Sequence, residues 1–448
     1  MHPFIEKFQG AQHRIAVVDR GATYTYQDLY QEIEKQYHWL SGRVPEGAVV
    51  ALCMDYSFSA ISLFLAMMEN KNVIIPIATT VPEEIESRLS EVPCAYRLIQ
   101  EPGGTLRLLS GTERHDSPVL LQKLQERGHA GLVLFSSGST GKPKAMVHDL
   151  TQLIAHYEGK RERKRNMTFL IFLMFDHIGG INTLLNSLAM HITMVLPERR
   201  EPEYIASLVE RYHVAVLPSS PTFLNLLLLS GAAEKYDLSS LRMITYGTEP
   251  MPSSLLLKLK AAFPHVRFLQ TFGTSETGII STVSKSSTST FLKFDDPDTE
   301  YKVVDGELWL RTKTQVMGYL NAKAERFTED GWFRTGDFVE EKDGFLRIVG
   351  RNSDMINVGG EKVMPEEVET VLLQMPGVED VTVYGESNPI TGQAVACKIK
   401  HRDAAVTPLE IKKEVRKFCK TRLASYKIPV RVVLMEQVEY TKRFKKKR

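Results

Sequence analysis

Residues 132–148 read LVLFSSGSTGKPKAMVH, an apolar run that ends in a loop rich in hydroxyl groups, glycine and lysine. The apolar run is typical of a buried strand. Glycines let successive backbone N–H groups turn toward one point, hydroxyls add donors and lysines add positive charge, so the loop suits phosphate oxygens. On composition alone, the loop is explained equally well as a flexible polar turn. The candidate phosphate-binding residues are Ser136, Ser137, Gly138, Ser139, Thr140, Gly141, Lys142 and Lys144.

The loop differs from the Walker pattern of nucleotide-binding proteins. The spacing that leads to Gly141 and Lys142 is wrong for that pattern, and Pro143 stands where Ser or Thr is required. A phosphate site here therefore belongs to another class of protein.

Composition places the chain among ordinary globular proteins. Its 448 residues allow up to about three domains. Apolar residues make up 43% and charged residues 25%, which argues against long disorder, collagen and coiled coil. The net charge is only +2, and the one basic cluster is residues 442–448. We therefore expect no nucleic-acid partner.

Cysteine usage and apolar runs bear on location. The four cysteines, Cys53, Cys94, Cys397 and Cys419, form no close pair in the sequence, which excludes zinc-site spacing and a disulfide framework. The first residues lack the pattern of a signal peptide. Apolar runs such as residues 169–175 are far shorter than the roughly 20 residues that span a bilayer. We expect a cytoplasmic protein without a transmembrane segment.

The first 300 residues alternate between helix and strand patterns. A helical pattern at residues 26–40, with Thr25 as its N-cap, precedes a strand pattern at 49–53. A second pair follows at 57–69 and 73–77. This alternation predicts an α/β fold with largely parallel sheets covered by helices. Further strands are predicted at residues 130–135, 168–175, 191–196, 214–217 and 243–246.

The pattern changes twice after residue 300. Residues 301–311 and 338–349 each predict a hairpin, around Asp305-Gly306 and Asp343-Gly344, and together they indicate a small antiparallel barrel or sheet. The last 95 or so residues predict a small α+β domain. Its expected elements are helices at residues 365–374 and from the Thr407 capping box to about 423, and strands at 381–384 and 394–400.

Four further motifs follow the loop in order: YGTEP at 246–250, QTFGTSE at 270–276, GWFRTGD at 331–337 and GRNSDMINVGG at 350–360. Together with the loop they resemble the ANL superfamily of adenylate-forming enzymes, which holds acyl- and aryl-CoA synthetases, peptide-synthetase adenylation domains and luciferases. The resemblance extends from about Thr23 to the C-terminus. It implies a large adenylate-forming domain (1–350) with parallel sheets and a small antiparallel barrel, a hinge (351–354) and a mobile α+β domain (355–448).

The resemblance also implies roles at the nucleotide. Glu276 would bind Mg²⁺, since a hard cation suits one carboxylate plus phosphate oxygens. Asp337 would accept hydrogen bonds from both ribose hydroxyls, with Arg351 assisting on the ribose or phosphate side. Phe272 replaces the usual Tyr and retains only stacking on adenine, and Ser275 replaces the usual Thr. The remaining implied nucleotide-binding residues are Gly247, Thr248, Glu249, Pro250, Thr271, Gly273 and Thr274.

On the acid side, the resemblance places His177 next to the incoming carboxylate, with a buried structural histidine as the alternative. Amino-acid-activating relatives use an Asp near this point to pair with the substrate ammonium, so Asp176 is either such a ligand or a structural acid. Gly179, Gly180 and Gly247 either leave room for a bulky acyl group or make close turns.

The catalytic lysine of the family lies near its C-terminus, and alignment on Thr441 and Arg448 assigns that role to Lys445. Phe444 stands where the family has Gly, and Lys442, Lys446 and Lys447 are alternatives. A solvated basic tail is the structural alternative. After rotation of the C-terminal domain, Gly359 and Gly360 would face the entry path of a pantetheine thiol.

The sequence therefore predicts an ATP- and Mg²⁺-dependent ligase that joins a fatty or aryl carboxylic acid to CoA. An acyl-AMP forms first with release of pyrophosphate, and the thioester with CoA forms second. One alternative is a stand-alone adenylation enzyme that loads a fatty or amino acid onto a carrier-protein pantetheine thiol. An alternative from another class is a catalytically decayed, nucleotide-binding regulatory protein.

Overall fold

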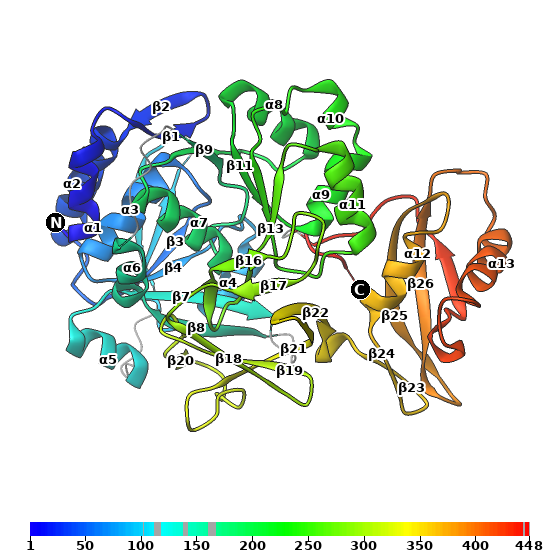
Figure 1. The fold of residues 1–448 in the computed structure, drawn as a ribbon. Coiled ribbons are helices and arrows are strands. Elements are labelled where there is room, and N and C mark those ends of the chain that lie inside the picture. The colour runs from blue at the N-terminus through cyan, green and yellow to red at the C-terminus, as the bar shows by residue number, and fades with distance from the viewer. Residues whose placement is uncertain (102, 112–117, 138–141, 160–166, 442–443, 448) are drawn as a thin grey trace.

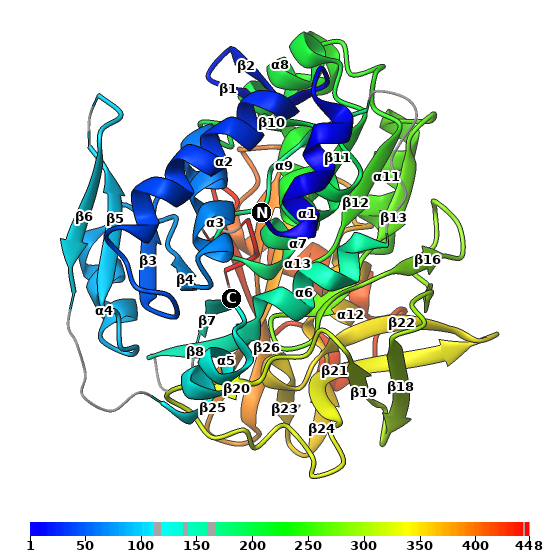
Figure 2. The ribbon, with the colours of Figure 1, turned by 90° about the vertical axis from the view of Figure 1, so that its left-hand side faces the viewer.

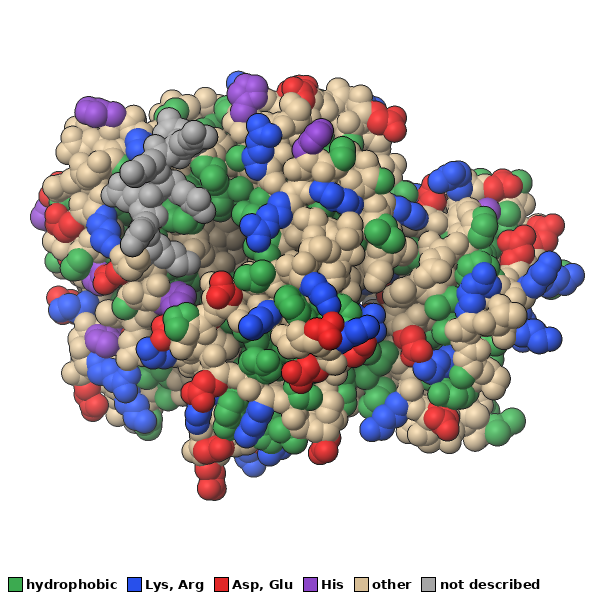
Figure 3. All heavy atoms as spheres, viewed as in Figure 1, with side chains coloured by type: hydrophobic (Ala, Val, Ile, Leu, Met, Phe, Trp, Pro, Cys, Tyr) green, Lys and Arg blue, Asp and Glu red, His purple; other side chains and the backbone are tan. Residues whose placement is uncertain are grey.

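The computed structural model describes residues 1–101, 103–111, 118–137, 142–159, 167–441 and 444–447. The chain forms a large lobe and a small lobe, and the small lobe holds the elements from Ile356 to Leu434 (Figure 1). The C-terminal segment leaves the small lobe and returns to the large lobe beside α9 (Pro221–Leu229) and α11 (Ser253–Ala262). Acidic and basic side chains are interspersed on the face drawn in Figure 3.

One seven-stranded sheet of the large lobe is parallel except at an edge, where β2 runs antiparallel to β1. α8 (Pro202–Tyr212), α9 and α11 pack on one of its faces. In spatial order the strands are β13 (Arg267–Gln270), β12 (Met243–Tyr246), β11 (Val216–Ser219), β9 (Thr168–Leu170), β10 (Thr193–Leu196), β1 (Ile15–Asp19) and β2 (Ala22–Thr25).

The second seven-stranded sheet is parallel in its centre and antiparallel at both edges. α4 (Pro82–Leu89) and α5 (Val119–Arg127) contribute to the core on one face. In spatial order the strands are β20 (Gly318–Tyr319), β8 (Pro143–Asp149), β7 (Gly131–Ser137), β4 (Val73–Pro76), β3 (Val49–Cys53), β5 (Tyr96–Gln100) and β6 (Leu106–Ser110).

A shared apolar core joins the two sheets through α3 (Phe58–Glu69), α6 (Leu150–Glu158) and α7 (Ile178–Ala189). α3 and α7 are apolar around most of their circumference, as expected of helices enclosed between sheets. Further out, α1 (Pro3–Glu6), η1 (Lys7–Ala11) and α2 (Tyr26–Ser41) lie on the side away from the small lobe (Figure 2). The predicted Thr25 cap of α2 is confirmed as a complete capping box.

The prediction of one long strand at residues 168–175 is wrong, because β9 ends at Leu170. The following residues leave the sheet, yet Ile171, Phe172 and Phe175 are fully or almost fully buried. The apolar run therefore reflects burial rather than strand conformation, an ambiguity that periodicity cannot resolve.

The predicted antiparallel region is an open six-stranded sheet, a half-barrel rather than a closed barrel. Both predicted hairpins are present as β18–β19 and β21–β22. In spatial order the strands are β16 (Thr282–Ser284), β17 (Leu292–Phe294), β22 (Phe345–Arg351), β21 (Phe333–Lys342), β19 (Glu307–Thr312) and β18 (Thr299–Val304). The short pair β14 (Phe272–Thr274) and β15 (Gly278–Ile280) and helix α10 (Ala232–Lys235) complete the large lobe.

The small lobe has its own apolar core, built from residues between Ile356 and Leu434. Thr407 caps its second helix as predicted, while β27 was not predicted from the sequence. The 3-10 turn η2 (Asn352–Asp354) directly precedes this core and lies within the segment 351–354 that is expected to be the hinge. Its elements are β23 (Ile356–Val358), β24 (Glu361–Val363), α12 (Pro365–Leu372), β25 (Val378–Asn388), β26 (Gly392–His401), α13 (Pro408–Cys419), η3 (Ser425–Lys427) and β27 (Arg431–Leu434).

Candidate active site

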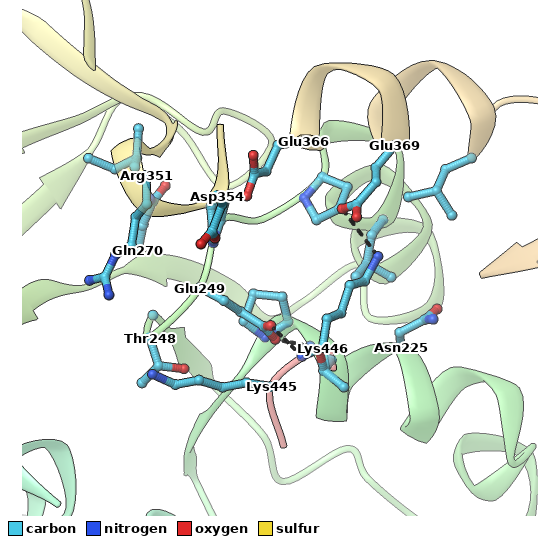
Figure 4. A pocket seen from close by; sticks show the side chains of 18 of the residues that line it. Asn225, Thr248, Glu249, Gln270, Arg351, Asp354, Glu366, Glu369, Lys445 and Lys446 are labelled. Atoms are coloured by element: carbon cyan, nitrogen blue, oxygen red, sulfur yellow. Dashed lines mark hydrogen bonds and ion pairs between the residues drawn. The ribbon is translucent and has the colours of Figure 1, made fainter. Parts of the chain in front are cut away.

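A cavity of about 430 Å³ lies between the two lobes. The loops that follow β12 and β13 form one wall, because the carboxyl ends of adjacent parallel strands open at the same sheet edge. α12 and β25 of the small lobe form the opposite wall (Figure 4). Of the predicted residues, those that line it are Gly247, Thr248, Glu249, Pro250, Thr271, Phe272, Gly273, Asp337, Arg351 and Lys445.

Asp337 and Arg351 face each other across β21 and β22. Arg351 Nε donates to Asp337 Oδ1 at 2.8 Å, and the Asp337 side chain is only 4% exposed. Its Oδ2 is buried and accepts no hydrogen bond from any residue that the structure describes. Burial raises the pKa of Asp337 and the charge of Arg351 opposes this shift. A buried acceptor of this kind is what a ribose hydroxyl would satisfy.

The loop after β12 has two unusual backbone positions. A side chain at Gly247 would place its Cβ 2.6 Å from Thr271 Oγ1, so this glycine permits a close approach of two loops rather than room for an acyl group. Thr248 adopts φ +73°, which is rare for a β-branched residue. Its buried Oγ1 has no hydrogen-bond partner within the described ranges. Strained backbone with an unpaired hydroxyl is typical of a ligand-binding position.

A second cavity of about 20 Å³ adjoins the first, and Thr248 and Lys445 line both. Its other lining residues are Phe172, Leu173, Met174, His177, Arg200 and Phe444. His177 lines this second cavity, and its Nδ1 also accepts from the N–H of Gly179 at 3.1 Å as the N-cap of α7. His177 thus has a structural role and remains a candidate for contact with the acid.

Asp176 forms a buried ion pair. Arg88 Nη1 lies 2.6 Å from Asp176 Oδ2, and the Asp176 side chain is 3% exposed. Asp176 does not line either cavity. The structural alternative for this acid is therefore favoured over recognition of a substrate ammonium.

The C-terminal segment enters the site as a tight turn. Phe444 adopts φ +51°, a conformation that favours glycine, which explains why the family pattern has Gly at this position. Its ring packs against Phe172, Phe223 and Tyr440 at centroid distances of 5.3, 5.4 and 5.2 Å. This burial offsets the unfavourable backbone conformation and brings Lys445 to the junction of the two cavities.

Of the alternative lysines, Lys446 lines the first cavity but not the second. Lys446 points away from Lys445 and toward Glu369 (Figure 4). Lys447 is exposed, and Lys442 lies outside the described residues. The geometry thus favours Lys445 for the catalytic role.

Glu276 lies in the turn between β14 and β15, outside both cavities. Tyr319 donates to Glu276 Oε1 at 3.0 Å, and burial followed by the Glu276 charge raises the pKa of Tyr319. Thr274 has a structural role, because its Oγ1 accepts from the N–H groups of Glu276 and Thr277. Ser275, between them, is half-buried and lines neither cavity.

The phosphate loop is described only at its ends. Gly138, Ser139, Thr140 and Gly141 and the Ser137 side chain lie outside the described part. Ser136 and Lys144 are paired across β7 and β8, Lys142 is exposed, and these three line neither cavity.

Gly359 and Gly360 form the exposed turn between β23 and β24, with φ values of +61° and +94°. They also lie outside both cavities. The structure thus brings Lys445, and not this turn, to the first cavity.

Several lining residues were missed by sequence reasoning. Glu366 and Glu369 are ordinary acids at the start of a helix, and Asn225 and Asp380 belong to no motif. Their position depends on how the lobes meet, which no local pattern encodes. Gln270 begins the motif at 270–276, which implied no role for it, and its Oε1 is buried without a partner in the described residues.

Gly180 offers a test of the close turn that positions His177. A Cβ here would clash with the carbonyl oxygen of Met174. Gly180→Ala should therefore destabilise the protein by about 1–3 kcal/mol in urea unfolding. Gly42→Ala is the matched control, because nothing lies within 4 Å of its added Cβ. Equal unfolding midpoints for the two variants would contradict this packing.

Comparison with known proteins gives the family. The family model "AMP-binding enzyme" matches residues 4–320, and the model "AMP-binding enzyme C-terminal domain" matches residues 367–445. A 2-succinylbenzoate–CoA ligase of Bacillus licheniformis is 31% identical over 67% of this chain and 65% of its own length. A 2-succinylbenzoate–CoA ligase of Geobacillus is 25% identical over 95% of this chain and 91% of its own.

Solved structures show the same fold. The anthranilate CoA ligase AuaEII, in complex with anthranoyl-AMP, has a TM-score of 0.81 at 21% identity over 98% of this chain and 94% of that chain. The amide bond synthetase McbA from Marinactinospora thermotolerans has a TM-score of 0.77 at 23% identity, over 99% and 97%. With the family models covering both lobes, the chain belongs to the AMP-binding enzymes of the adenylate-forming superfamily.

Proposed function

We propose that this chain is an ATP- and Mg²⁺-dependent carboxylic acid–CoA ligase that acts through an acyl-AMP. One observation carries the proposal: Lys445 lies where the cavity containing Asp337 and Arg351 meets the cavity containing His177. A nucleotide in the first cavity would meet the carboxylate of an acid that reaches the second cavity, whose 20 Å³ has room for about one water molecule, beside that ammonium group. This arrangement also argues against a decayed, purely regulatory protein.

In the first half-reaction, an oxygen of the acid attacks the α-phosphorus of ATP. The bond from that phosphorus to the oxygen bridging the α- and β-phosphates breaks, and pyrophosphate leaves. Asp337 would hold the ribose hydroxyls and Phe272 would stack on adenine. Lys445 would neutralise the charge that gathers at the α-phosphate, and such electrostatic stabilisation is the main source of catalysis in phosphoryl-type transfers.

The sequence assigns Mg²⁺ to the carboxylate of Glu276, and the surroundings of this side chain suit the cation. The hydrogen bond from Tyr319 orients Glu276, and a carboxylate has further lone pairs for a hard cation. When bound, the cation would neutralise the charge of the phosphate oxygens. We assign no second Mg²⁺ ligand among the described residues.

In the second half-reaction, a thiol attacks the acyl carbon and AMP leaves. We propose that residues 355–448 rotate about 351–354 relative to residues 1–350, which would bring Gly359 and Gly360 to the thiol. The exposed turn they form, with no bulky side chain, suits close passage of a pantetheine arm.

The acid is proposed to be fatty or aromatic. Phe172, Leu173, Met174 and Phe444 provide apolar walls around His177. An amino acid is disfavoured, because the carboxylate of Asp176 is already paired with Arg88. The similar proteins named as CoA ligases for 2-succinylbenzoate and anthranilate agree with this class of substrate.

Product analysis over a panel of acids tests the proposal. Purified protein with ATP, Mg²⁺ and CoA should yield AMP and an acyl-CoA from at least one aliphatic or aromatic acid. Acyl transfer to a carrier-protein pantetheine but not to CoA would favour the adenylation alternative. ATP consumption that releases ADP, with no thioester from any acid, would exclude the ligase.

A cytoplasmic location remains part of the proposal. All four cysteines are free thiols, three of them buried. Among the described residues, none of the helices has the length and apolarity needed to cross a bilayer. Cell fractionation would test the location.

Glu276→Gln should raise the Mg²⁺ concentration required for half-maximal activity by about tenfold or more, because an amide oxygen is a weaker ligand for a hard cation. The Gln side chain still accepts the Tyr319 hydrogen bond, so folding should be retained. Tyr319→Phe, which leaves the carboxylate, is the control and should change the requirement much less. An unchanged magnesium titration in Glu276→Gln would remove this residue from the metal site.

A further inference from the structure

Lys446 lies in a buried cluster of acceptors on the small lobe. Its Nζ donates to the carbonyl oxygen of Val381 at 2.6 Å and lies 3.4 Å from Glu369 Oε2 and 3.5 Å from Asp380 Oδ1. The Lys446 side chain is 13% exposed and both carboxylates are 3% exposed. A solvated basic tail would show none of these contacts. The side chain of Lys446 therefore ties the C-terminal segment to α12 and β25.

The same residue also meets the large lobe. The N–H of Lys446 donates to Glu249 Oε2 at 3.1 Å, and Glu249 Oε1 accepts from the N–H of Thr222 at 2.7 Å, in the first turn of α9. Nearby, Asn225 Nδ2 of α9 donates to Asp380 Oδ1 at 3.3 Å. Lys446 thus lies at a joint between the tail and both lobes (Figure 4).

We propose that Lys446 is a positioning residue for adenylation, which fixes the direction of Lys445 through this joint. The inference rests on the proposed function. Figure 4 shows the two neighbouring side chains leaving the tail in different directions, Lys446 toward Glu369 and Lys445 toward Thr248. Anchoring Lys446 among Glu369, Asp380 and Val381 therefore points Lys445 at the junction of the two cavities.

The joint should matter for only one half-reaction. The contacts of Lys446 Nζ lie within the small lobe and would move with it. The hydrogen bond from the N–H of Lys446 to Glu249 and the hydrogen bond from Asn225 to Asp380 join the two lobes, so both must break on rotation. Thioester formation, which follows the rotation, does not use Lys445. Loss of the Lys446 ammonium should thus impair adenylation and spare thiol transfer.

The test compares Lys446→Met with Lys447→Met in both half-reactions. Both variants remove one positive charge from the tail, but Lys447 is exposed. Lys446→Met should lower kcat for acid-dependent ATP–pyrophosphate exchange by about 10²-fold, as a misplacement of about 1 Å does. Thioester formation from supplied acyl-AMP should stay within about twofold of wild type. Lys447→Met should match wild type in both, and Lys446→Arg should recover part of the exchange activity.

Two results would overturn this role. Exchange rates of Lys446→Met that equal those of Lys447→Met would show that Lys446 does not position Lys445. Equal losses in both half-reactions would indicate a general structural role, because supplied acyl-AMP bypasses adenylation. If the wild-type protein catalyses the exchange, either of these results for Lys446→Met leaves the ligase proposal intact. Wild type that shows no exchange with any acid overturns the ligase proposal and this one together.

Discussion

Lys445→Ala is expected to slow acid-dependent ATP–pyrophosphate exchange by about 10²–10³-fold, the usual cost of losing one group that stabilises charge in the transition state. Lys445 lines both cavities, so in the proposed mechanism its ammonium lies where the acid would meet the α-phosphate. The effect should fall on kcat more than on KM for ATP, because the charge develops during attack. Radiolabelled pyrophosphate and single-turnover kinetics would measure it.

The matched measurement for this variant is the second half-reaction. Lys445→Ala given preformed acyl-AMP and CoA should form thioester at close to the wild-type rate, which also proves that it folds. Lys447→Ala is the control for loss of charge in the tail. If Lys445→Ala retains both half-reactions, a group other than Lys445 stabilises the charge at the α-phosphate.

Asp337→Ala is expected to raise the KM for ATP by about 10²-fold. Truncating one member of a buried, hydrogen-bonded charge pair costs about 2–5 kcal/mol, and the 49% exposure of the Arg351 side chain puts this pair at the lower end of that range. Here the change removes the acceptors proposed for ribose and leaves Arg351 without the carboxylate that it contacts at 2.8 Å. Exchange assays at varied ATP would give KM.

Deoxynucleotides separate the ribose contact from general damage. Wild type should discriminate against 2′-deoxy-ATP and 3′-deoxy-ATP, and Asp337→Ala should lose most of that discrimination. Asp337→Asn, which is nearly isosteric, should show an intermediate preference. The same discrimination in Asp337→Ala as in wild type would place the ribose elsewhere.

Local signals predicted the framework well. The Thr25 N-cap, the Thr407 capping box, the hairpins at Asp305-Gly306 and Asp343-Gly344 and the α/β alternation are all present, because each depends on residues close in sequence. The run at 168–175 failed because buried loop and buried strand have the same apolar composition. The β27 strand lacked a distinctive pattern and pairs with β26 through tertiary contacts.

The site was predictable only as far as its motifs extend. Asp337 and Lys445 were identified by resemblance, and the structure brings both to one cavity. The tolerance of Phe at 444 was not predictable, since it depends on packing against Phe172 and Phe223 from distant segments. The ion pair between Asp176 and Arg88 was also not predictable, because the two residues lie far apart in the sequence.

The central claim is that ATP is split between its α- and β-phosphorus to make an acyl-AMP. Exchange of labelled pyrophosphate into ATP by the purified protein, with Mg²⁺ and a panel of acids but without thiol, tests this most directly. We predict exchange that depends on at least one fatty or aromatic acid and that stops when the acid is omitted. Absence of exchange with every acid, in protein shown by calorimetry to bind no ATP, would contradict the account.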